Sequence, residues 1–282
     1  MTVLDGKAVA KAVREEIKKE AELLAEKGET IGLAVILVGE NPASQVYVRN
    51  KEKACAEVGI SSLVVRMAES STQNEIIAEV ERLNSDDSIN GIIVQLPLPK
   101  GIDENAVLER IAPHKDVDGC TPYQKGLLWT GRPSLIACTP YGVIKILEHY
   151  GISPSGKSAV VVGRSNLVGK PLAQLLLDRN ATVTLCHSKT PDLKAVTKSA
   201  DILCVAIGKE NFITADMVKE GAVVIDVGIN RTEKGLRGDV DFEEVKDKAS
   251  FITPVPGGVG PMTVTMLLYN TLKAKQLSLT QD

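Results

Sequence analysis

The chain has 282 residues, with 33 Lys and Arg against 36 Asp and Glu, a formal net charge of -3 and only 3% aromatic residues. A nearly neutral chain with few aromatic rings lacks the basic surface and the stacking platforms of nucleic-acid-binding proteins. No apolar run approaches the length of a membrane span, and the N-terminus lacks the basic and apolar regions of a signal peptide. We therefore expect a cytoplasmic protein with no nucleic-acid or membrane partner, long enough for two domains.

The cysteines and histidines indicate neither disulfides nor a metal site. The five cysteines are an odd number without C-x-x-C spacing, and the three histidines lie far apart in the chain. This pattern is typical of reduced, mostly buried thiols in a cytosolic protein. Because no group of these residues has the spacing of metal ligands, we expect no bound metal.

The first part of the chain alternates between helical and strand patterns. Residues 6–27 have helical periodicity with many charges, and the apolar run 32–38 is typical of a buried strand. The alternation continues, with strands expected at 62–67 and 91–98 and helices at 43–58, 73–84 and 103–111. Consecutive strand–helix units imply a parallel sheet with both faces covered, because parallel strands need crossover connections.

Several polar side chains in this part stand where a ligand can bind. Tyr47 and Lys51 are four residues apart on an expected helix, so they project from one face. Gln95 lies at the carboxyl end of an apolar strand, where α/β proteins bind ligands, and a buried carboxamide needs partners. On spacing alone, the ordinary interpretation, a tyrosine packed at a helix edge beside a solvated lysine, is favoured over a ligand site. Asp118 follows Asp116 in a loop, where acids are usually solvated or capping.

The second part of the chain has the pattern of a doubly wound nucleotide-binding domain. After a passage rich in proline and glycine, a helix is expected at 141–150, then strands at 158–163, 181–186, 201–206 and 222–226, each followed by a helix or turn. The sequence thus predicts an α/β protein of two domains with a cleft between them. These are an N-terminal domain with a parallel sheet (1–139) and a Rossmann-like domain (140–261), with the C-terminal helix, 262–282, packing back on the first.

A glycine turn near the start of the second domain is the most informative motif. An apolar strand at 158–162 is broken by Gly163, and Gly169 and Pro171 open an apolar helix. A strand that turns tightly into a helix aims free N–H groups at one point, the usual seat of a dinucleotide pyrophosphate. Ser165 stands where the second glycine of the usual fingerprint would be. Glycines at such a turn can also serve close packing alone.

The end of the next strand indicates which dinucleotide binds. An NAD site usually has an acidic residue about 20 residues beyond the glycine turn, where it binds the ribose hydroxyls. Here the strand ends in His187-Ser188-Lys189, and Arg164 lies in the turn itself. A 2′-phosphate needs charge-assisted donors and is repelled by a carboxylate, so the pattern favours NADP over NAD. The alternative is that both cations are ordinary surface charges.

A series of motifs then connects the two halves of the chain. In order they are Tyr47-x3-Lys51, Val94-Gln95-Leu96-Pro97-Leu98-Pro99, Lys115-Asp116-Val117-Asp118-Gly119, Cys138-Thr139-Pro140, Gly163-Arg164-Ser165-x-x-Val168-Gly169-x-Pro171, Asp226-Val227-Gly228-Ile229-Asn230 and Pro254-Val255-Pro256-Gly257-Gly258-Val259-Gly260-Pro261-Met262-Thr263. In these motifs and their order the chain resembles the bifunctional methylenetetrahydrofolate dehydrogenase/methenyltetrahydrofolate cyclohydrolase family over nearly its whole length. One segment departs from the family pattern: residues 121–126 replace an Asn-x-Gly-Arg-like run.

The resemblance implies a homodimeric enzyme that oxidises methylenetetrahydrofolate with NADP and hydrolyses the methenyl product to 10-formyltetrahydrofolate in the same cleft. It also implies residue roles. Tyr47 would stack on the aminobenzoyl ring, Lys51 would act in hydrolysis with Gln95 bonded to it, and Asp118 would hold the pterin. Further folate contacts would come from Ser44, Pro256, Gly257 and Gly258, and the NADP site would be lined by Gly163, Arg164, Ser165, Ser188 and Ile229.

Physical chemistry accounts for these implied roles. Hydride leaves a carbon flanked by two nitrogens whose lone pairs stabilise the cation, so the oxidation needs positioning rather than proton transfer. Hydrolysis must deprotonate water, and a partly desolvated lysine beside a cationic substrate is expected to have a lowered pKa. A carboxylate such as Asp118 can accept two N–H bonds from an amino-pyrimidinone edge.

Two other interpretations of the sequence stay open. One is another two-domain NADP-dependent dehydrogenase, resembling shikimate dehydrogenases, in which a lysine works with an aspartate on a hydroxyl substrate. The other is a non-catalytic NADP-binding module, which needs the glycine turn but not Tyr47, Lys51, Gln95 and Asp118 together. The aromatic ring one turn from the lysine favours a flat conjugated substrate over a shikimate-like one.

Overall fold

The computed structural model describes residues 1–132, 134–233 and 235–280, and the chain forms two compact units. The six-stranded unit comprises Met1–Lys11 and Ala137–Thr263, and the three-stranded unit comprises Ala12–Ile136 and Val264–Asp282. The first residues lie with the six-stranded unit, whereas the sequence pattern places them in the first domain. The reason is a two-residue strand, β1 (Thr2–Val3), which pairs in parallel with β11 (Phe251–Ile252).

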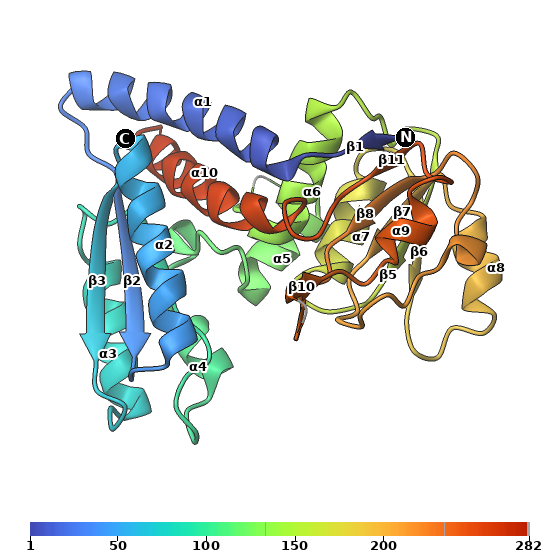
Figure 1. The fold of residues 1–282 in the computed structure, drawn as a ribbon. Coiled ribbons are helices and arrows are strands. Elements are labelled where there is room, and N and C mark those ends of the chain that lie inside the picture. Colours follow the sequence, from blue (N-terminus) through green and yellow to red (C-terminus); the bar gives the residue numbers. More distant parts are fainter. Residues whose placement is uncertain (133, 234, 281–282) are drawn as a thin grey trace. The chain divides into compact units, whose positions relative to one another are not determined.

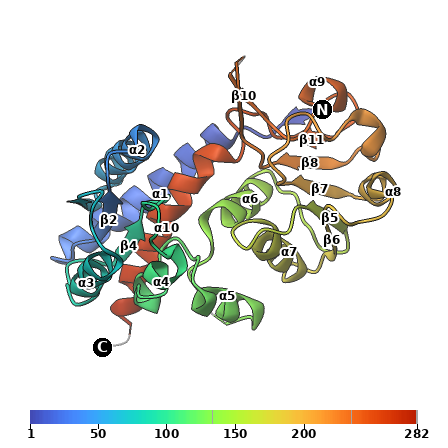
Figure 2. The ribbon, with the colours of Figure 1, turned by 90° about the horizontal axis from the view of Figure 1, so that it is seen from below.

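The three-stranded unit is built on a parallel sheet in the order β3-β2-β4. Its strands are β2 (Gly32–Val38), β3 (Ser61–Met67) and β4 (Gly91–Val94). All residues of β2 are buried, as expected for a central parallel strand covered on both faces. Helices α2 (Pro42–Val58) and α3 (Gln73–Asn84) cover opposite faces of this sheet (Figure 2). The predicted parallel sheet is confirmed.

Two long helices and several short ones complete the three-stranded unit. The long ones are α1 (Gly6–Glu26) and α10 (Gly260–Ser278), which lie side by side (Figure 1) and are joined by a 3.0 Å hydrogen bond from Arg14 Nε to Thr265 Oγ1. The C-terminal helix also holds the middle of the chain, because Asn270 Nδ2 donates to the carbonyls of Val117 and Ile136, both at 2.8 Å. The short helices are α4 (Glu104–Leu108), the 3-10 turn η1 (Pro113–Lys115) and α5 (Pro122–Trp129).

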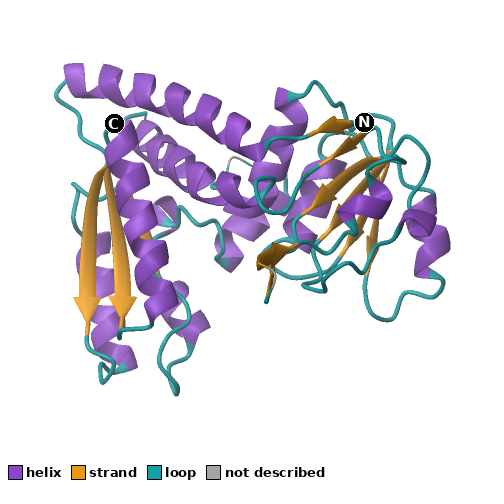
Figure 3. Cartoon of the chain, in the orientation of Figure 1, coloured by secondary structure: helices purple, strands orange, loops and turns teal. Residues whose placement is uncertain are grey.

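The six-stranded unit contains an all-parallel sheet in the order β1-β11-β8-β7-β5-β6. The strands not yet given are β5 (Ser158–Val162), β6 (Thr182–Cys186), β7 (Ile202–Val205) and β8 (Val223–Asp226). Its helices are α6 (Cys138–His149), α7 (Gly169–Leu177), α8 (Leu193–Lys198), the turn η2 (Ala215–Met217) and α9 (Phe242–Val245). Figure 3 shows these helices around the strands, the doubly wound arrangement that the sequence predicts.

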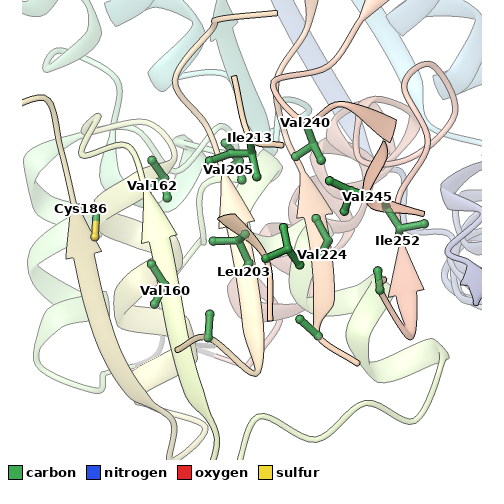
Figure 4. Close-up of a cluster of buried hydrophobic side chains, with 14 residues drawn as sticks. Val160, Val162, Cys186, Leu203, Val205, Ile213, Val224, Val240, Val245 and Ile252 are labelled. Atoms are coloured by element: carbon green, nitrogen blue, oxygen red, sulfur yellow. The ribbon is translucent and has the colours of Figure 1, made fainter. Parts of the chain in front are cut away.

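One face of the larger sheet carries a compact hydrophobic core. Side chains of β5, β7 and β8, among them Val160, Leu203 and Val224, pack with Val240 and with Val245 of α9 (Figure 4). α6 and α7 lie on the other face (Figure 2), and α7 contacts β5 and β6. Helices on both faces leave the carboxyl ends of the strands as the open edge, where ligands bind in such sheets.

The structure differs from the sequence predictions mainly in short elements. β4 ends at Val94 rather than at residue 98, because the prolines that follow have no N–H for the sheet ladder. α5 lies within a passage expected to be irregular. The hairpin of β9 (Asn230–Thr232) and β10 (Gly235–Arg237) is also absent from the prediction. The strands of this hairpin have three residues each, too few to show a period in the sequence, and α5 has little more than two helical turns.

Candidate active site

In the three-stranded unit, α2 and the end of β4 bring two predicted site residues into contact. Lys51 Nζ donates to Gln95 Oε1 at 2.9 Å. Gln95 Nε2 donates to the carbonyl of Leu96 at 2.8 Å, which fixes the carboxamide with its oxygen toward the lysine. The backbone N–H of Gln95 donates to Ile36 O at 2.9 Å and anchors this residue to the central strand. The sheet therefore holds Gln95, and helix α2 holds Lys51.

Tyr47 lies one turn before Lys51 on the same helix, and its side chain is 50% exposed. A tyrosine packed at a helix edge would be largely covered, so the exposed ring favours the interpretation as a stacking platform. Ser44, one turn earlier, is buried, and its N–H donates to the side chain of Asn41, which caps the helix. Cap and sheet together fix the direction of α2 and so of the ring.

Asp118 reaches the same end of β4 through a short parallel bridge. The bridge pairs Asp116 with Ile92, so Asp118 comes level with Val94, next to Gln95. Asp118 is exposed, whereas the carboxylate of Asp116 is buried and accepts the N–H groups of Gly119 at 3.1 Å and Thr121 at 2.9 Å. Burial raises the pKa of Asp116. The register therefore brings all four predicted catalytic residues to one end of one sheet.

The segment that departs from the family pattern, residues 121–126, begins α5. Thr121 Oγ1 accepts the N–H of Gln124 at 3.4 Å as the helix cap. The buried carboxamide of Gln124 donates to Pro113 O at 2.5 Å and accepts the N–H of Leu135 at 2.8 Å. Gln124 therefore holds the neighbouring loops together, and Thr121 caps the helix that carries it.

In the six-stranded unit, the glycine turn is required by backbone packing. Gly163 has φ +120°, and a Cβ there would lie 2.2 Å from Ala206 O. A Cβ on Gly169 would lie 1.9 Å from Gly163 O, so the first turn of α7 packs directly on the end of β5. Ser165 Oγ accepts the N–H groups of Val168 at 3.1 Å and Gly169 at 3.3 Å. Gly163 and Gly169 therefore serve close packing, the alternative that the sequence left open. The same packing forms the tight turn that a pyrophosphate site needs.

Two donors lie beyond the ends of neighbouring strands in this unit. Val162 of β5 pairs with Cys186 of β6, so Arg164 and Ser188 each lie two residues beyond that pair. Both side chains are exposed, as is that of Lys189. Because no carboxylate lies among residues 187–189, this corner fits a 2′-phosphate.

The other predicted contact residues of this unit lie in loops after β8 and β11. Ile229 is 56% exposed, as expected for a side chain available to a ligand. Pro256 is exposed, and Gly257 and Gly258 are buried. A Cβ on Gly6, at the start of α1, would lie 1.7 Å from Gly258 O, so the backbone of this loop packs directly on that helix.

The sequence reading missed a pair of buried carboxylates in this unit, Asp226 and Asp239. The carboxylate of Asp226 accepts the N–H groups of Gly228 (2.9 Å), Asp239 (3.0 Å) and Val240 (2.9 Å). Gly228 and Gly238 are necessary here, because a Cβ on either would lie about 2 Å from a carboxylate oxygen of the pair. Asp226 begins the motif Asp226-Val227-Gly228-Ile229-Asn230, but nothing in the sequence marks Asp239 as its neighbour.

The pair predicts a pH dependence of stability. Burial, with a smaller contribution from Asp239, raises the pKa of Asp226 to about 6, whereas in the unfolded chain it ionises near 4. Since the folded state binds the proton more tightly than the unfolded chain, protonation of Asp226 stabilises the fold. This stabilisation is present below about pH 4 and is lost as the pH rises through 6. Asp226→Asn cannot ionise, so the parent should lose roughly 2 kcal/mol relative to it between pH 4 and 7. Urea unfolding of both proteins at the two pH values checks this, and a constant difference would contradict it.

Comparison with known proteins fits this description of a two-unit α/β protein with a dinucleotide turn and a lysine–carboxamide site. Residues 4–118 match the family model for the tetrahydrofolate dehydrogenase/cyclohydrolase catalytic domain, and residues 137–279 match that for its NAD(P)-binding domain. The chain therefore belongs to the tetrahydrofolate dehydrogenase/cyclohydrolase family. The predicted fold class and dinucleotide-binding domain are confirmed.

Three relatives illustrate how far the similarity extends. The "Bifunctional protein FolD" of Halalkalibacterium halodurans is 56% identical over 272 residues, 96% of this chain and 98% of that protein. The bifunctional FolD crystal structure from Campylobacter jejuni is 54% identical and has a TM-score of 0.96, with 99% of each chain covered. The Trypanosoma brucei enzyme, solved with NADP cofactor and an inhibitor, is 41% identical with a TM-score of 0.92, covering 99% of this chain and 98% of that one.

The shikimate dehydrogenase interpretation is not supported. The shikimate dehydrogenase of Aquifex aeolicus is 14% identical, with a TM-score of 0.52, so it shares the fold alone.

Among residues 1–132, 134–233 and 235–280, no group of three or more His, Cys, Asp or Glu side chains is arranged to hold a metal ion. In the same part of the chain, no helix has the length and apolar character that a membrane span needs.

Proposed function

We propose that the protein catalyses two successive steps of tetrahydrofolate interconversion. The first is NADP-dependent oxidation of methylenetetrahydrofolate to methenyltetrahydrofolate, and the second is hydrolysis of that product to 10-formyltetrahydrofolate. The observation that carries the proposal is the 2.9 Å hydrogen bond between Lys51 and Gln95, one turn from the exposed ring of Tyr47. Its close relatives are bifunctional FolD proteins, and one was solved with NADP.

In the oxidation, the chain has to bind and align its ligands. NADP, when bound, supplies the hydride acceptor. We assign its phosphates to Gly163, Arg164, Ser165 and Ser188, with Ile229 against the dinucleotide. The one-carbon bridge lies between two nitrogens that stabilise the cation, so no side chain has to move a proton in this step. Tyr47 stacks on the aminobenzoyl ring, and Asp118 accepts two N–H groups of the pterin.

In the hydrolysis, Lys51 handles the proton. A water oxygen bonds to the methenyl carbon, and the Lys51 amine takes the proton that the water loses. The hydroxyl of this adduct then loses its proton as its C=O bond forms and the ring C–N bond on the N5 side breaks; N5 takes up one proton, so one proton is released overall and the formyl group stays on N10. Gln95 holds the amine without adding charge. Ser44, Pro256, Gly257 and Gly258 are assigned to further folate contacts.

A spectrophotometric assay tests the whole proposal. The purified protein should reduce NADP with methylenetetrahydrofolate, much faster than it reduces NAD. Added methenyltetrahydrofolate should lose its absorbance faster with the protein than in buffer alone. Tight NADPH binding with neither reaction would contradict the proposal and favour a non-catalytic NADP-binding module.

The assembly and location of the protein are part of the same proposal. We infer a homodimer in the cytoplasm that needs no metal and binds neither nucleic acid nor membrane, as the sequence and the family resemblance indicate. Light scattering coupled to gel filtration measures the first point. A mass near twice the 30.2 kDa of one chain is expected, and a mass near that of one chain would contradict the dimer.

A further inference from the structure

The carboxylate of Asp239 collects four hydrogen bonds from two loops. Its side chain is buried, and Oδ2 accepts the N–H groups of Ile207 at 2.7 Å and Gly208 at 2.9 Å. Its Oδ1 accepts the N–H of Lys209 at 2.8 Å and Asn230 Nδ2 at 2.9 Å. All four partners are donors, so only an acceptor with two oxygens satisfies them.

The loop after β7 lies next to the glycine turn, and the segment after β8 lies one strand further along the sheet. Residues 207–209 follow β7, and Asn230 follows Ile229 in the segment after β8. β7 lies between β5 and β8, and a Cβ on Gly163 would lie 2.2 Å from Ala206 O, so the turn packs directly against the start of the first loop. Asp226 accepts the N–H of Asp239 itself at 3.0 Å and thereby fixes the position of the second carboxylate.

We propose that Asp239 is a positioning residue for dinucleotide binding, which holds the loops after β7 and β8 in the conformation that the ligand requires. Consecutive backbone N–H groups form a nest for an anion, and here a side chain of the protein fills it. The loops are therefore ordered before the ligand arrives, and binding does not have to bear the entropy of ordering them. This inference rests on the proposed NADP site.

A separate observation supports the same kind of role for Asp116 in the three-stranded unit. Its buried carboxylate accepts the N–H groups of Gly119 and Thr121, which brackets the exposed Asp118 in a fixed turn. The preceding residue, Lys115, instead donates to the carbonyls of Leu83, Asn84 and Asp86 at 3.1, 2.9 and 2.8 Å, and so closes the end of α3. We infer that Asp116 is a positioning residue for the folate-binding Asp118.

The two aspartates serve as matched controls for each other in the full-length protein. Asp239→Asn and Asp116→Asn both put an NH2 group among N–H donors while keeping the size of the side chain. Asp239→Asn should raise the Kd of NADPH at least about tenfold and change the KM for methenyltetrahydrofolate by less than about twofold. Asp116→Asn should raise the KM for methenyltetrahydrofolate at least about tenfold and change the Kd of NADPH by less than about twofold. Lys115→Met removes the hydrogen bonds of the residue before Asp116 but leaves the turn after Asp116 intact. It should lower Tm and leave the Kd of NADPH and the KM for methenyltetrahydrofolate near the parent values.

NADPH fluorescence titration and the hydrolysis of methenyltetrahydrofolate without cofactor give these two readouts, and circular dichroism checks the fold. If Asp239→Asn does not fold, Asn230→Ala removes one of the four hydrogen bonds and should raise the Kd of NADPH about threefold. A folded Asp239→Asn with the parent Kd would overturn the first inference. Equal losses in both readouts from both aspartate variants would overturn both. A parent protein that does not bind NADPH would instead contradict the proposed function.

Discussion

Replacing Lys51 with methionine is expected to reduce the hydrolysis of methenyltetrahydrofolate by at least about 10²-fold and to leave dehydrogenase activity measurable. Methionine keeps the length and the apolar stem of the side chain but cannot take a proton. The oxidation needs only the alignment of its reactants, so it should survive, and the methenyl intermediate should accumulate in solution. The measurement is the pair of initial rates on the purified, folded variant.

Two further variants make this result specific. Lys53→Met is the same substitution two residues away, on an exposed part of α2, and should leave both rates near the parent values. Tyr47→Ala should damage both reactions, because both use the same bound folate. A Lys51→Met protein that hydrolyses the methenyl compound at the parent rate would remove Lys51 from the mechanism.

The sequence predicted the parts of the fold that depend on periodicity. The strands at 32–38 and 158–162 are uninterrupted apolar runs, and the structure places them inside parallel sheets, buried on both faces or nearly so. It did not predict that Thr2–Val3 would join the sheet of the second half, because two residues carry no period and their partner lies almost 250 residues away. The hairpin of β9 and β10 escaped prediction because its strands have only three residues each.

The sequence likewise indicated some residues of the candidate site and not others. Gln95 could be suspected from sequence because a carboxamide at the end of an apolar strand is conspicuous, and it proves to be the hydrogen-bond partner of Lys51. Asp239 could not, since its four partners are three backbone N–H groups about 30 residues away and one asparagine. Backbone N–H groups are the same in every sequence, so a side chain that binds them leaves no pairing signal.

The second large effect is expected at the cofactor. Arg164→Ala should weaken NADP binding at least about tenfold and change NAD binding far less. Arg164 is exposed beyond the end of β5, beside Ser188 beyond β6, so its guanidinium can reach a phosphate on the adenosine ribose. Charge-assisted hydrogen bonds of this kind contribute roughly 1.5–3 kcal/mol, which corresponds to a tenfold or greater change in Kd.

A matched variant separates this local effect from net charge. Lys157→Ala removes one positive charge at the exposed amino end of the same strand, β5, away from the carboxyl edge where Arg164 lies. It should change NADP and NAD binding equally and little, since exposed charges separated by more than about 10 Å are largely screened by salt. The discriminating quantity is the ratio of the two dissociation constants, titrated for both variants at one ionic strength. If Arg164→Ala weakens both cofactors by the same factor, the arginine acts on the shared pyrophosphate or on the turn itself, and the preference for NADP must come from Ser188 and Lys189.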